Sequence, residues 1–425
     1  MKISRRQFVK AMAAMSAASM LAACGGNSGS GSSGGKKALT FQIWDVAQKE
    51  GMEAMCAAYT QQHPEVSIEV QVTSWNEYWT KLEAAATSNQ MPDIFWMHTN
   101  EILKYADNGM LADCSDIVEK DKFSEISLSN AMGSNGTLYA VPKDKDTVGL
   151  VYNKEMFDAA GVAYPDENWT WDDLVSASEK IYAATGKYGY MAYADDQLGY
   201  WNFVYQAGGY ILNEDKTKAG FTQPATEKAM KFYIGLQQND WCPDQTYFAE
   251  TAPGTAFFSE KGAMFLEGDW NILAELQNYP EMVGKWDVAV LPKCPDPESG
   301  DGRATISNGL CYATAASNKN LDTVKDILKF FCSEEGQRIQ GESGAAIPAY
   351  QGLEDTWAGC FAEYPINIQC FIEMFEYSIQ SVNNASRPEW KSKVNDELLK
   401  IYAGTEDIDT GLQKMQDIVD QASAG

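Results

Sequence analysis

The sequence predicts an α/β fold with two lobes, and three observations lead to this prediction. The chain has 425 residues, 45% of them hydrophobic, which is enough for two domains of ordinary size. Strand and helix patterns alternate over residues 38–109, as in a largely parallel sheet with helical crossovers. Residues 138–154 then place two apolar runs on either side of a polar centre. This pattern suits a segment that passes from one lobe to the other.

The first lobe is predicted from strands that are each followed by a helix. The strands are expected over 38–44, 66–72 and 94–96. The helices are expected over 51–62, over 76–88 and around Ile102, the last one ending at a glycine cap, Asn108–Gly109. Ligands gather at the carboxyl ends of strands in such sheets. The side chains that fall there are Trp44, Asp45, Trp75, Trp96 and His98.

The crossing segment and two further runs carry a resemblance to a known family. They are YAVPKDKDTVGLVYNKEMFDAAGV, with MPDIFW upstream and EKGAMFLEGDWN downstream. They resemble the extracellular sugar-binding lipoproteins of bacterial ABC importers, the maltodextrin-binding-protein-like group, and the likeness extends over essentially the whole chain after Cys24. The resemblance implies a periplasmic-binding-protein-like fold of type II. It also implies a three-crossing hinge, a ligand cleft between the lobes, and neither a catalytic residue nor a cofactor.

The two lobes are then expected to be discontinuous in the chain. The N-terminal lobe would combine 38–145 with 308–347, and the C-terminal lobe 146–307 with 348–425. The second lobe is predicted to hold a helix over 171–185 with a capping box at Thr170, because an acidic residue follows three positions later. Further elements are expected as strands over 188–193 and 263–266 and as helices over 225–239, 368–382, 389–402 and 412–419.

Candidate ligand-binding residues follow from the chemistry of sugars, which combine C–H faces with a ring of hydroxyl groups. Flat aromatic rings suit the faces, and planar Asp, Asn or Glu groups suit the hydroxyls. The aromatic candidates are Trp270, Trp96, Trp201, Trp44 and Trp75. The polar candidates are Asp45, Asp144, Asp146, Asp196, Asp269, His98, Asn100 and Asn308. For each tryptophan the alternative is packing within its own lobe, and for each polar residue it is a solvated or purely structural role.

The N-terminus has the features of an export signal. A basic start, a short apolar run and Leu21–Ala22–Ala23–Cys24 resemble the signal peptide and lipobox of bacterial lipoproteins. We expect residues 1–23 to be removed and Cys24 to be acylated, for instance with palmitate. Residues 24–37 would then form a flexible linker at the extracytoplasmic face of the cell membrane. The run SRRQFVK resembles the twin-arginine export motif, and the general secretory route is the alternative.

The charge, the motifs and the cysteine spacing of the sequence limit the partners and cofactors that we expect. Removing residues 1–23 changes the formal charge from −26 to −30, which disfavours nucleic acid. The sequence contains no G-x-x-x-x-G-K-[ST] motif, so an importer's ATPase would be another chain that acts with the membrane permease. No CxxC pair occurs among the eight cysteines after Cys24, so we expect no metal and mostly small buried cysteines, with disulfides left open. We expect a monomer.

Three other functions stay open at this point. A glycosidase would use paired carboxylates, which 59 Asp and Glu residues could supply. The same fold also takes polyamines, glycerol phosphate esters or metal ions, and an acid-lined aromatic cleft suits a polyamine best. A structural surface lipoprotein without a small ligand is the third. The order of the crossing segments favours a binding protein over an enzyme.

Overall fold

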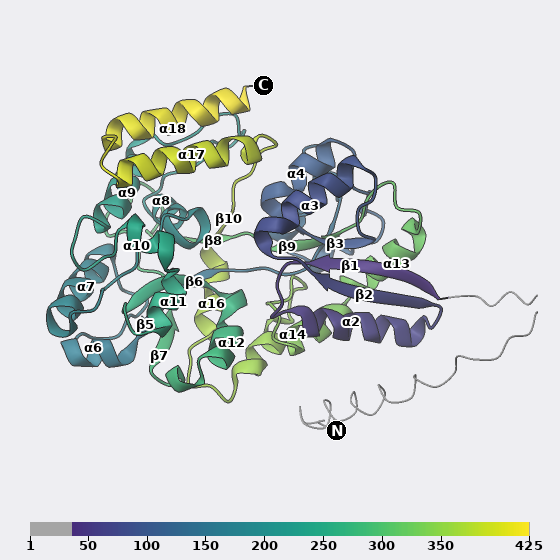
Figure 1. The fold of residues 1–425 in the computed structure, drawn as a ribbon, viewed down its shortest axis with the longest axis horizontal. Helices are drawn as coiled ribbons and strands as arrows, with labels where there is room; N and C mark the ends of the chain where they lie inside the picture. Colours follow the sequence, from purple (N-terminus) through teal and green to yellow (C-terminus); the bar gives the residue numbers. More distant parts are fainter. Residues whose placement is uncertain (1–35, 425) are drawn as a thin grey trace, which may run out of the picture. The chain divides into compact units, whose positions relative to one another are not determined.

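The computed structural model of the protein describes residues 36–424. The predicted signal peptide, Cys24 and the linker up to residue 35 lie outside the described residues. The described chain contains two hydrophobic cores, which define an N-terminal and a C-terminal lobe (Figure 1). Between residues 36 and 424, no helix combines the length and apolar character needed to cross a membrane.

The N-terminal lobe is built on a five-stranded sheet with the order β2-β1-β3-β9-β4. Its strands are β1 (Lys37–Ile43), β2 (Val66–Val72), β3 (Ile94–His98), β4 (Val141–Pro142) and β9 (Leu310–Ala313). β1 pairs in parallel with β2 and β3, as predicted, whereas β9 runs antiparallel to β3 and β4. The antiparallel strand arises because β9 enters the sheet from the opposite lobe.

Helices cover both faces of this sheet, with α3 and α4 on one side and α2 on the other (Figure 1). The helices of the lobe are α2 (Lys49–Gln62), α3 (Trp75–Thr87), α4 (Thr99–Asp107), η1 (Lys120–Lys122), α5 (Glu125–Ser129), α13 (Leu321–Phe331) and α14 (Glu334–Glu342). Gly109 follows α4 with a φ of 69°, a conformation that favours glycine. The predicted strand–helix alternation of residues 38–109 is therefore confirmed.

The C-terminal lobe has a three-stranded antiparallel sheet of order β6-β5-β7 at its centre. The strands are β5 (Val148–Asn153), β6 (Met264–Gly268) and β7 (Trp286–Ala289). Around them lie α6 (Lys154–Ala160), α7 (Trp171–Thr185), η2 (Asp196–Tyr200), α8 (Trp201–Gln206), α9 (Pro224–Leu236), α10 (Gln245–Glu250), α11 (Pro253–Phe258), α12 (Asp269–Asn278) and η3 (Pro280–Met282). The last part of the chain adds α15 (Glu354–Ala358), η4 (Gly359–Phe361), α16 (Gln369–Glu373), η5 (Met374–Tyr377), α17 (Arg387–Tyr402) and α18 (Ile408–Ser423).

The capping box predicted for α7 is present. The Thr170 side chain accepts a hydrogen bond from the Asp173 backbone N–H, and the Asp173 carboxylate accepts one from the Thr170 N–H at 2.9 Å. These two bonds satisfy donors that would otherwise be unpaired at the first turn. The helix begins at Trp171 and ends before Gly186, as the sequence predicts.

Two predicted elements of this lobe are wrong. Residues 188–193 form no strand, because Gly189 donates to the Trp241 carbonyl and Met191 to the Met264 carbonyl, so no continuous ladder develops. The helix predicted over 368–382 stops early, and its last part becomes β10 (Ser378–Gln380), which pairs in parallel with β8 (Thr305–Ser307). In both cases a tertiary partner far along the chain overrides the local pattern.

Three crossings connect the lobes and are hydrogen-bonded to one another. The first crossing (143–147) joins β4 to β5, the second (308–309) joins β8 to β9, and the third (343–349) leads from α14 to the C-terminal lobe. The Lys143 N–H donates to the Leu310 carbonyl at 2.9 Å, and the Lys145 N–H donates to the Ile347 carbonyl at 3.1 Å. The crossings therefore form one connected region between the lobes, the hinge region.

The cysteines of the described chain are largely interior residues. Seven are buried, as predicted: Cys56, Cys114, Cys242, Cys294, Cys311, Cys332 and Cys370. Burial raises the pKa of the Cys114 and Cys242 thiols to about 12, so these side chains stay protonated and act as small apolar residues.

Candidate functional site

An aromatic cluster occupies the carboxyl ends of β1, β2 and β3. The Trp44 ring lies edge-on to Trp75 at 5.1 Å and to Trp96 at 5.0 Å between ring centroids. Trp75 is 43% exposed and Trp44 is partly buried, whereas Trp96 has no exposed surface. Trp75 and Trp44 therefore have ring surface available for stacking. Trp96, also predicted to stack, supports them from within the core.

His98 and Asn100 lie beside this cluster, at the start of α4. His98 Nδ1 accepts a hydrogen bond from the Asn100 N–H at 3.1 Å, which places the ring proton on Nε2 in the neutral imidazole. Burial lowers the pKa of His98 to about 3, and the positive charges of Arg387 and Lys391 act in the same direction. The Asn100 Oδ1 atom is buried and has no hydrogen-bond partner within residues 36–424.

Two carboxyl groups of the hinge region are buried and close to each other. Asp146 Oδ1 accepts from the Asn308 N–H at 2.6 Å, and Asp269 Oδ1 accepts from the Thr147 N–H at 2.9 Å. Burial, reinforced by Asp144, raises the pKa of Asp146 to about 7. Burial and the charge of Asp146 raise the pKa of Asp269 well above its ordinary value. Both groups can therefore hold a proton near neutral pH and donate as well as accept hydrogen bonds.

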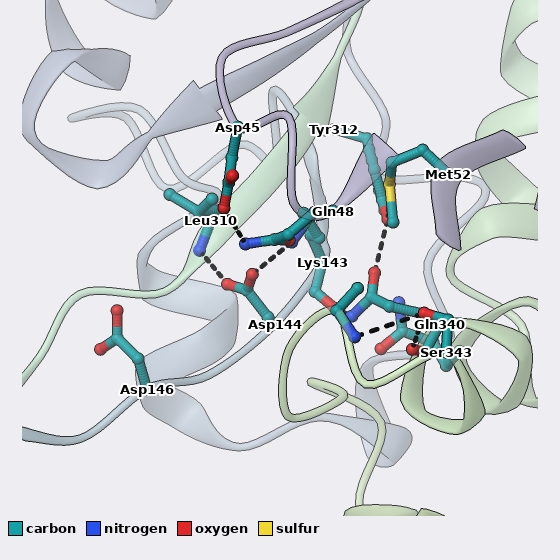
Figure 2. A network of polar contacts seen from close by, with 12 residues as sticks. Asp45, Gln48, Met52, Lys143, Asp144, Asp146, Leu310, Tyr312, Gln340 and Ser343 are labelled. Atoms are coloured by element: carbon teal, nitrogen blue, oxygen red, sulfur yellow. Dashed lines mark hydrogen bonds and ion pairs between the residues drawn. The ribbon is translucent and has the colours of Figure 1, made fainter. Parts of the chain in front are cut away.

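Asp144 and Asp45 belong to a second polar network, which joins the loop after β1 to the first crossing (Figure 2). The Lys143 ammonium group is fully buried, forms an ion pair with Asp144 at 2.5 Å and donates to Gln48 at 2.9 Å. Gln48 in turn donates to Asp45 at 3.1 Å. Asp144 also accepts from the Leu310 N–H at 2.6 Å. The existing partners of Asp45 and Asp144 give both residues a structural role in this network.

Asn308, in the second crossing, has a side-chain donor and a side-chain acceptor that are both without a partner among the described residues. Its side chain is buried, and these two atoms are Nδ2 and Oδ1. Its backbone is fully engaged, because the N–H donates to Asp146 and the carbonyl accepts from Asn130 Nδ2. Buried polar atoms without partners are rare, and they point to a bound molecule or water that supplies the missing bonds.

On the C-terminal lobe, Asp196 is held by two cations that the sequence did not reveal. Arg387 contacts its carboxylate at 2.6 Å and Lys391 at 3.0 Å. Burial alone would raise the pKa of Asp196, but Lys391 and Arg387 outweigh burial and lower it below the ordinary range. The Arg387 guanidinium also lies 4.6 Å from the Trp201 ring, which is 1% exposed. Trp201, like Trp96 under Lys143 at 4.5 Å, therefore has a cation over its ring.

Trp270 occupies the first turn of α12, directly after β6. The ring is partly buried and packs against the C-terminal core. A Cβ atom at Gly268 would come within 2.1 Å of this ring, so only glycine permits its position. Strand β6 leads directly into α12, which begins at Asp269. The partly buried ring retains a limited exposed surface.

A cavity of about 440 Å³ is lined by residues of both lobes. Its walls include Thr99, Ile102 and Met132 of the N-terminal lobe and Gln380, Ser381 and Asn383 of the C-terminal lobe. None of the residues predicted for the site lines it, but Asn308 is linked to it through hydrogen bonds. Gln380 donates to Asn130, the partner of Asn308, at 3.0 Å, and Asn383 Nδ2 donates to the Thr99 carbonyl.

Asn383 adds another unused acceptor at this interface. It is 5% exposed, and its Oδ1 lacks a hydrogen-bond donor among the described residues. Sequence reasoning missed Gln380, Asn383, Arg387 and Lys391: Gln380 was placed in a helix, and the partners of the other three lie in distant parts of the chain. Together with Asn100 and Asn308, Asn383 gives the interface buried amide groups from both lobes. Such groups can bind a neutral, hydroxyl-rich molecule.

Comparisons with known proteins agree with this architecture. Residues 54–366 match the family model described as bacterial extracellular solute-binding protein. The diacetylchitobiose binding protein DasA of Streptomyces coelicolor is 25% identical, with 82% of this chain and 84% of the relative covered. The galactooligosaccharide-binding protein of Bacillus subtilis is 24% identical, with 78% of each chain covered.

Two solved structures have a similar fold. An ABC substrate-binding protein from Listeria monocytogenes in complex with cycloalternan superposes with a TM-score of 0.82 at 22% identity, covering 92% of this chain and 99% of that one. The GacH receptor of Streptomyces glaucescens, solved unliganded and with acarbose, gives a TM-score of 0.79 at 20% identity with the same coverage. These likenesses confirm the predicted two-lobed α/β fold class.

Proposed function

Because this chain belongs to the bacterial extracellular solute-binding proteins, we propose that it captures a mono- or oligosaccharide between its lobes and delivers it to the permease of an ABC importer. Members of this family are binding proteins that act outside the cytoplasm. Several curated relatives are named for oligosaccharides. ATP hydrolysis would belong to a separate subunit.

The observation that carries the proposal is the set of buried amides without partners at the interface of the lobes. Asn308 lacks partners for both side-chain polar atoms, and Asn100 and Asn383 each lack one, within the described chain. Each such atom costs about 1–3 kcal/mol when it stays unpaired. The hydroxyl groups of a sugar can both donate and accept hydrogen bonds, so a sugar that reaches these residues would supply the missing partners. The exposed ring of Trp75 would stack on a sugar face.

The mechanism follows from the hinge. Asn100 belongs to the N-terminal lobe, Asn308 to a crossing and Asn383 to the C-terminal lobe. A ligand that bonds to all three is bound more tightly when the lobes are close, and it shifts the population toward that state. The closed, loaded protein is the form that a permease would distinguish from the empty one.

The charges at the interface favour a neutral ligand over a polyamine. Asp196 is already paired with Arg387 and Lys391. The raised pKa values of Asp146 and Asp269 reduce their negative charge near neutral pH. A polycation would meet two buried or half-buried cations and few free carboxylates, so the acidic composition of the whole chain does not extend to this site.

A thermal-shift screen of the purified mature chain tests the proposal. Neutral mono- and oligosaccharides are compared with putrescine and spermidine at equal concentration. We expect at least one carbohydrate to raise the melting temperature, because a ligand that binds only the folded state must stabilise it. A response to polyamines with none to any sugar would contradict the proposal. Hydrolysis of the sugar during incubation would indicate a glycosidase instead.

We further propose that the chain is a monomeric lipoprotein held by acylated Cys24 at the extracytoplasmic face of the cell membrane. A lipid anchor would keep the receptor near its permease at high effective concentration. Replacement of Cys24 by alanine should move the protein from the membrane fraction to the soluble extracytoplasmic fraction with unchanged sugar affinity. Ser28→Ala in the linker serves as the control and should stay with the membrane. Membrane retention of the Cys24→Ala protein would refute the anchor.

A further inference from the structure

A second cavity, of about 420 Å³, lies within the C-terminal lobe. Its walls come from the chain before and within η2, from α11, from β6 and from α12. The lining includes Tyr193, Phe258, Phe265, Glu267, Glu275 and Tyr279. None of the residues assigned above to the inter-lobe site lines this cavity. It is therefore a separate feature, although α12 begins beside the hinge.

Two neighbouring carboxyl groups face one another in this cavity. Glu267 is 6% exposed, and its Oε1 accepts from the Gly268 N–H at 2.9 Å and from Asn271 Nδ2 at 3.0 Å. Glu275 Oε2 is shielded from solvent, and no donor in the described chain reaches it. Burial and the neighbouring Glu267 raise the pKa of Glu275 well above its ordinary value.

The lining contains no group that could balance this pair of acids. Lysine, arginine and histidine are all missing from the cavity walls formed by the described residues. This differs from the inter-lobe site, where Arg387 and Lys391 neutralise Asp196. The carboxyl pair must therefore retain a proton or receive a cation from outside the chain.

The rest of the cavity wall is largely apolar and aromatic. The rings of Phe258 and Tyr279 are stacked at 4.3 Å between centroids, and Phe265 lies 6.4 Å from Phe258. Met191 and Leu198 complete the apolar part. Aromatic faces attract cations and also bury apolar groups. The cavity thus combines a carboxyl pair with a surface suited to a hydrocarbon body.

We propose that this cavity is a second binding site, which takes a small organic ammonium ion with an apolar body. The three N–H donors of a primary ammonium group match the open oxygen of Glu275 and the oxygens of Glu267. Its charge balances the pair, and its hydrocarbon part packs on Phe258, Phe265 and Tyr279. A neutral alcohol of the same shape would leave the negative charge uncompensated. The proposal does not depend on the carbohydrate function.

Binding at this site displaces a proton from the carboxyl pair, so it depends on pH. Glu267 also interacts with the carboxylate of Asp195, and the other titratable groups in the wall are the hydroxyls of Tyr193 and Tyr279. Because burial raises the pKa of both glutamates, the pair holds more protons at pH 5 than at pH 8. Ammonium binding should therefore strengthen from pH 5 to pH 8.

Calorimetric titration with cyclohexylammonium and with cyclohexanol tests this site, because the two probes share one ring and differ in charge. We expect the intact protein to bind cyclohexylammonium at least tenfold more tightly than cyclohexanol. Glu275→Gln and Glu267→Gln should each weaken cyclohexylammonium binding at least tenfold. Both variants should fold, since the amide keeps the shape of the side chain and removes a buried acid. Glu179→Gln, an exposed residue of α7, removes the same charge elsewhere and should change nothing.

Other outcomes would overturn the proposal. Equal binding of cyclohexanol would show an apolar cavity without a cation preference. Unchanged cyclohexylammonium binding in the double Glu267→Gln and Glu275→Gln variant would place the amine elsewhere. Equally tight binding of calcium ions from CaCl₂ would show that the two carboxylates bind any cation and do not select an organic ammonium ion. Asn308→Ala separates the two sites, because it should weaken sugar binding and leave cyclohexylammonium binding unchanged.

Discussion

Replacing Asn308 by alanine is expected to weaken carbohydrate binding about 10- to 100-fold without lowering the melting temperature of the free protein. The side chain has a buried donor and a buried acceptor without partners in residues 36–424, so in the free protein it contributes a desolvation cost and no compensating bond. Its backbone contacts with Asp146 and Asn130 do not depend on the side chain. Calorimetric titration with a sugar found in the screen measures the affinity, and thermal unfolding measures the stability.

This substitution is informative because the affinity is expected to fall while the stability of the free protein does not. A purely structural asparagine would lose stability when truncated, and its effect on affinity would follow from partial unfolding. Asn168→Ala, an exposed asparagine of the C-terminal lobe, is the matched control and should leave both quantities unchanged. Full sugar affinity in Asn308→Ala would exclude this side chain from the binding site.

Replacing Lys143 by methionine is expected to lower the free energy of unfolding by about 3–5 kcal/mol. The ammonium group is fully buried, and its loss leaves the Asp144 carboxylate, which is 6% exposed, without its counter-charge. Gln48 loses its donor at the same time, and the link between the loop after β1 and the hinge is broken (Figure 2). Urea unfolding followed by circular dichroism gives the free energy, provided that the transition is cooperative.

A double variant shows whether the buried charge is the cause. Combining Lys143→Met with Asp144→Asn removes both charges and should recover much of the lost stability, since replacing a whole buried ion pair is far less costly than breaking it. Lys122→Met interrupts an exposed ion pair with Asp121 and should cost less than about 1 kcal/mol. Equal losses in the single and double variants would show that packing of the lysine stem, and not its charge, holds the hinge.

Much of the fold could be predicted from the sequence because its signals are local. The α7 helix begins and ends where the capping box and Gly186 place it, and the strands and helices of residues 38–109 follow their apolar periodicity. β10 could not be predicted, because residues 378–380 gain their extended conformation from pairing with β8, more than seventy residues earlier in the chain. The short stretch carries no alternation of its own that would outweigh the helical pattern around it.

The candidate site was predicted less completely, for the same physical reason. Asp146, Asp269 and Asn308 come together because each lies at a strand end or a crossing, and such positions can be recognised in the sequence. Trp96 and Trp201 were expected to stack on a ligand, but cations from distant segments cover their rings. The partnership of Asp196 with Arg387 joins residues from different elements, and no spacing rule reveals it. Direct contact of any of these residues with a sugar stays a prediction.

Hydrogen exchange measured by mass spectrometry, with and without a saturating sugar, tests capture between the lobes most directly. We expect slower exchange in peptides that contain Asn100, the second crossing around Asn308, and the segment 380–384, because these lie on both lobes and at the hinge. Peptides around Glu275 should be unaffected. Protection confined to one lobe, or absent from the second crossing, would contradict the proposal that the sugar is held between the lobes.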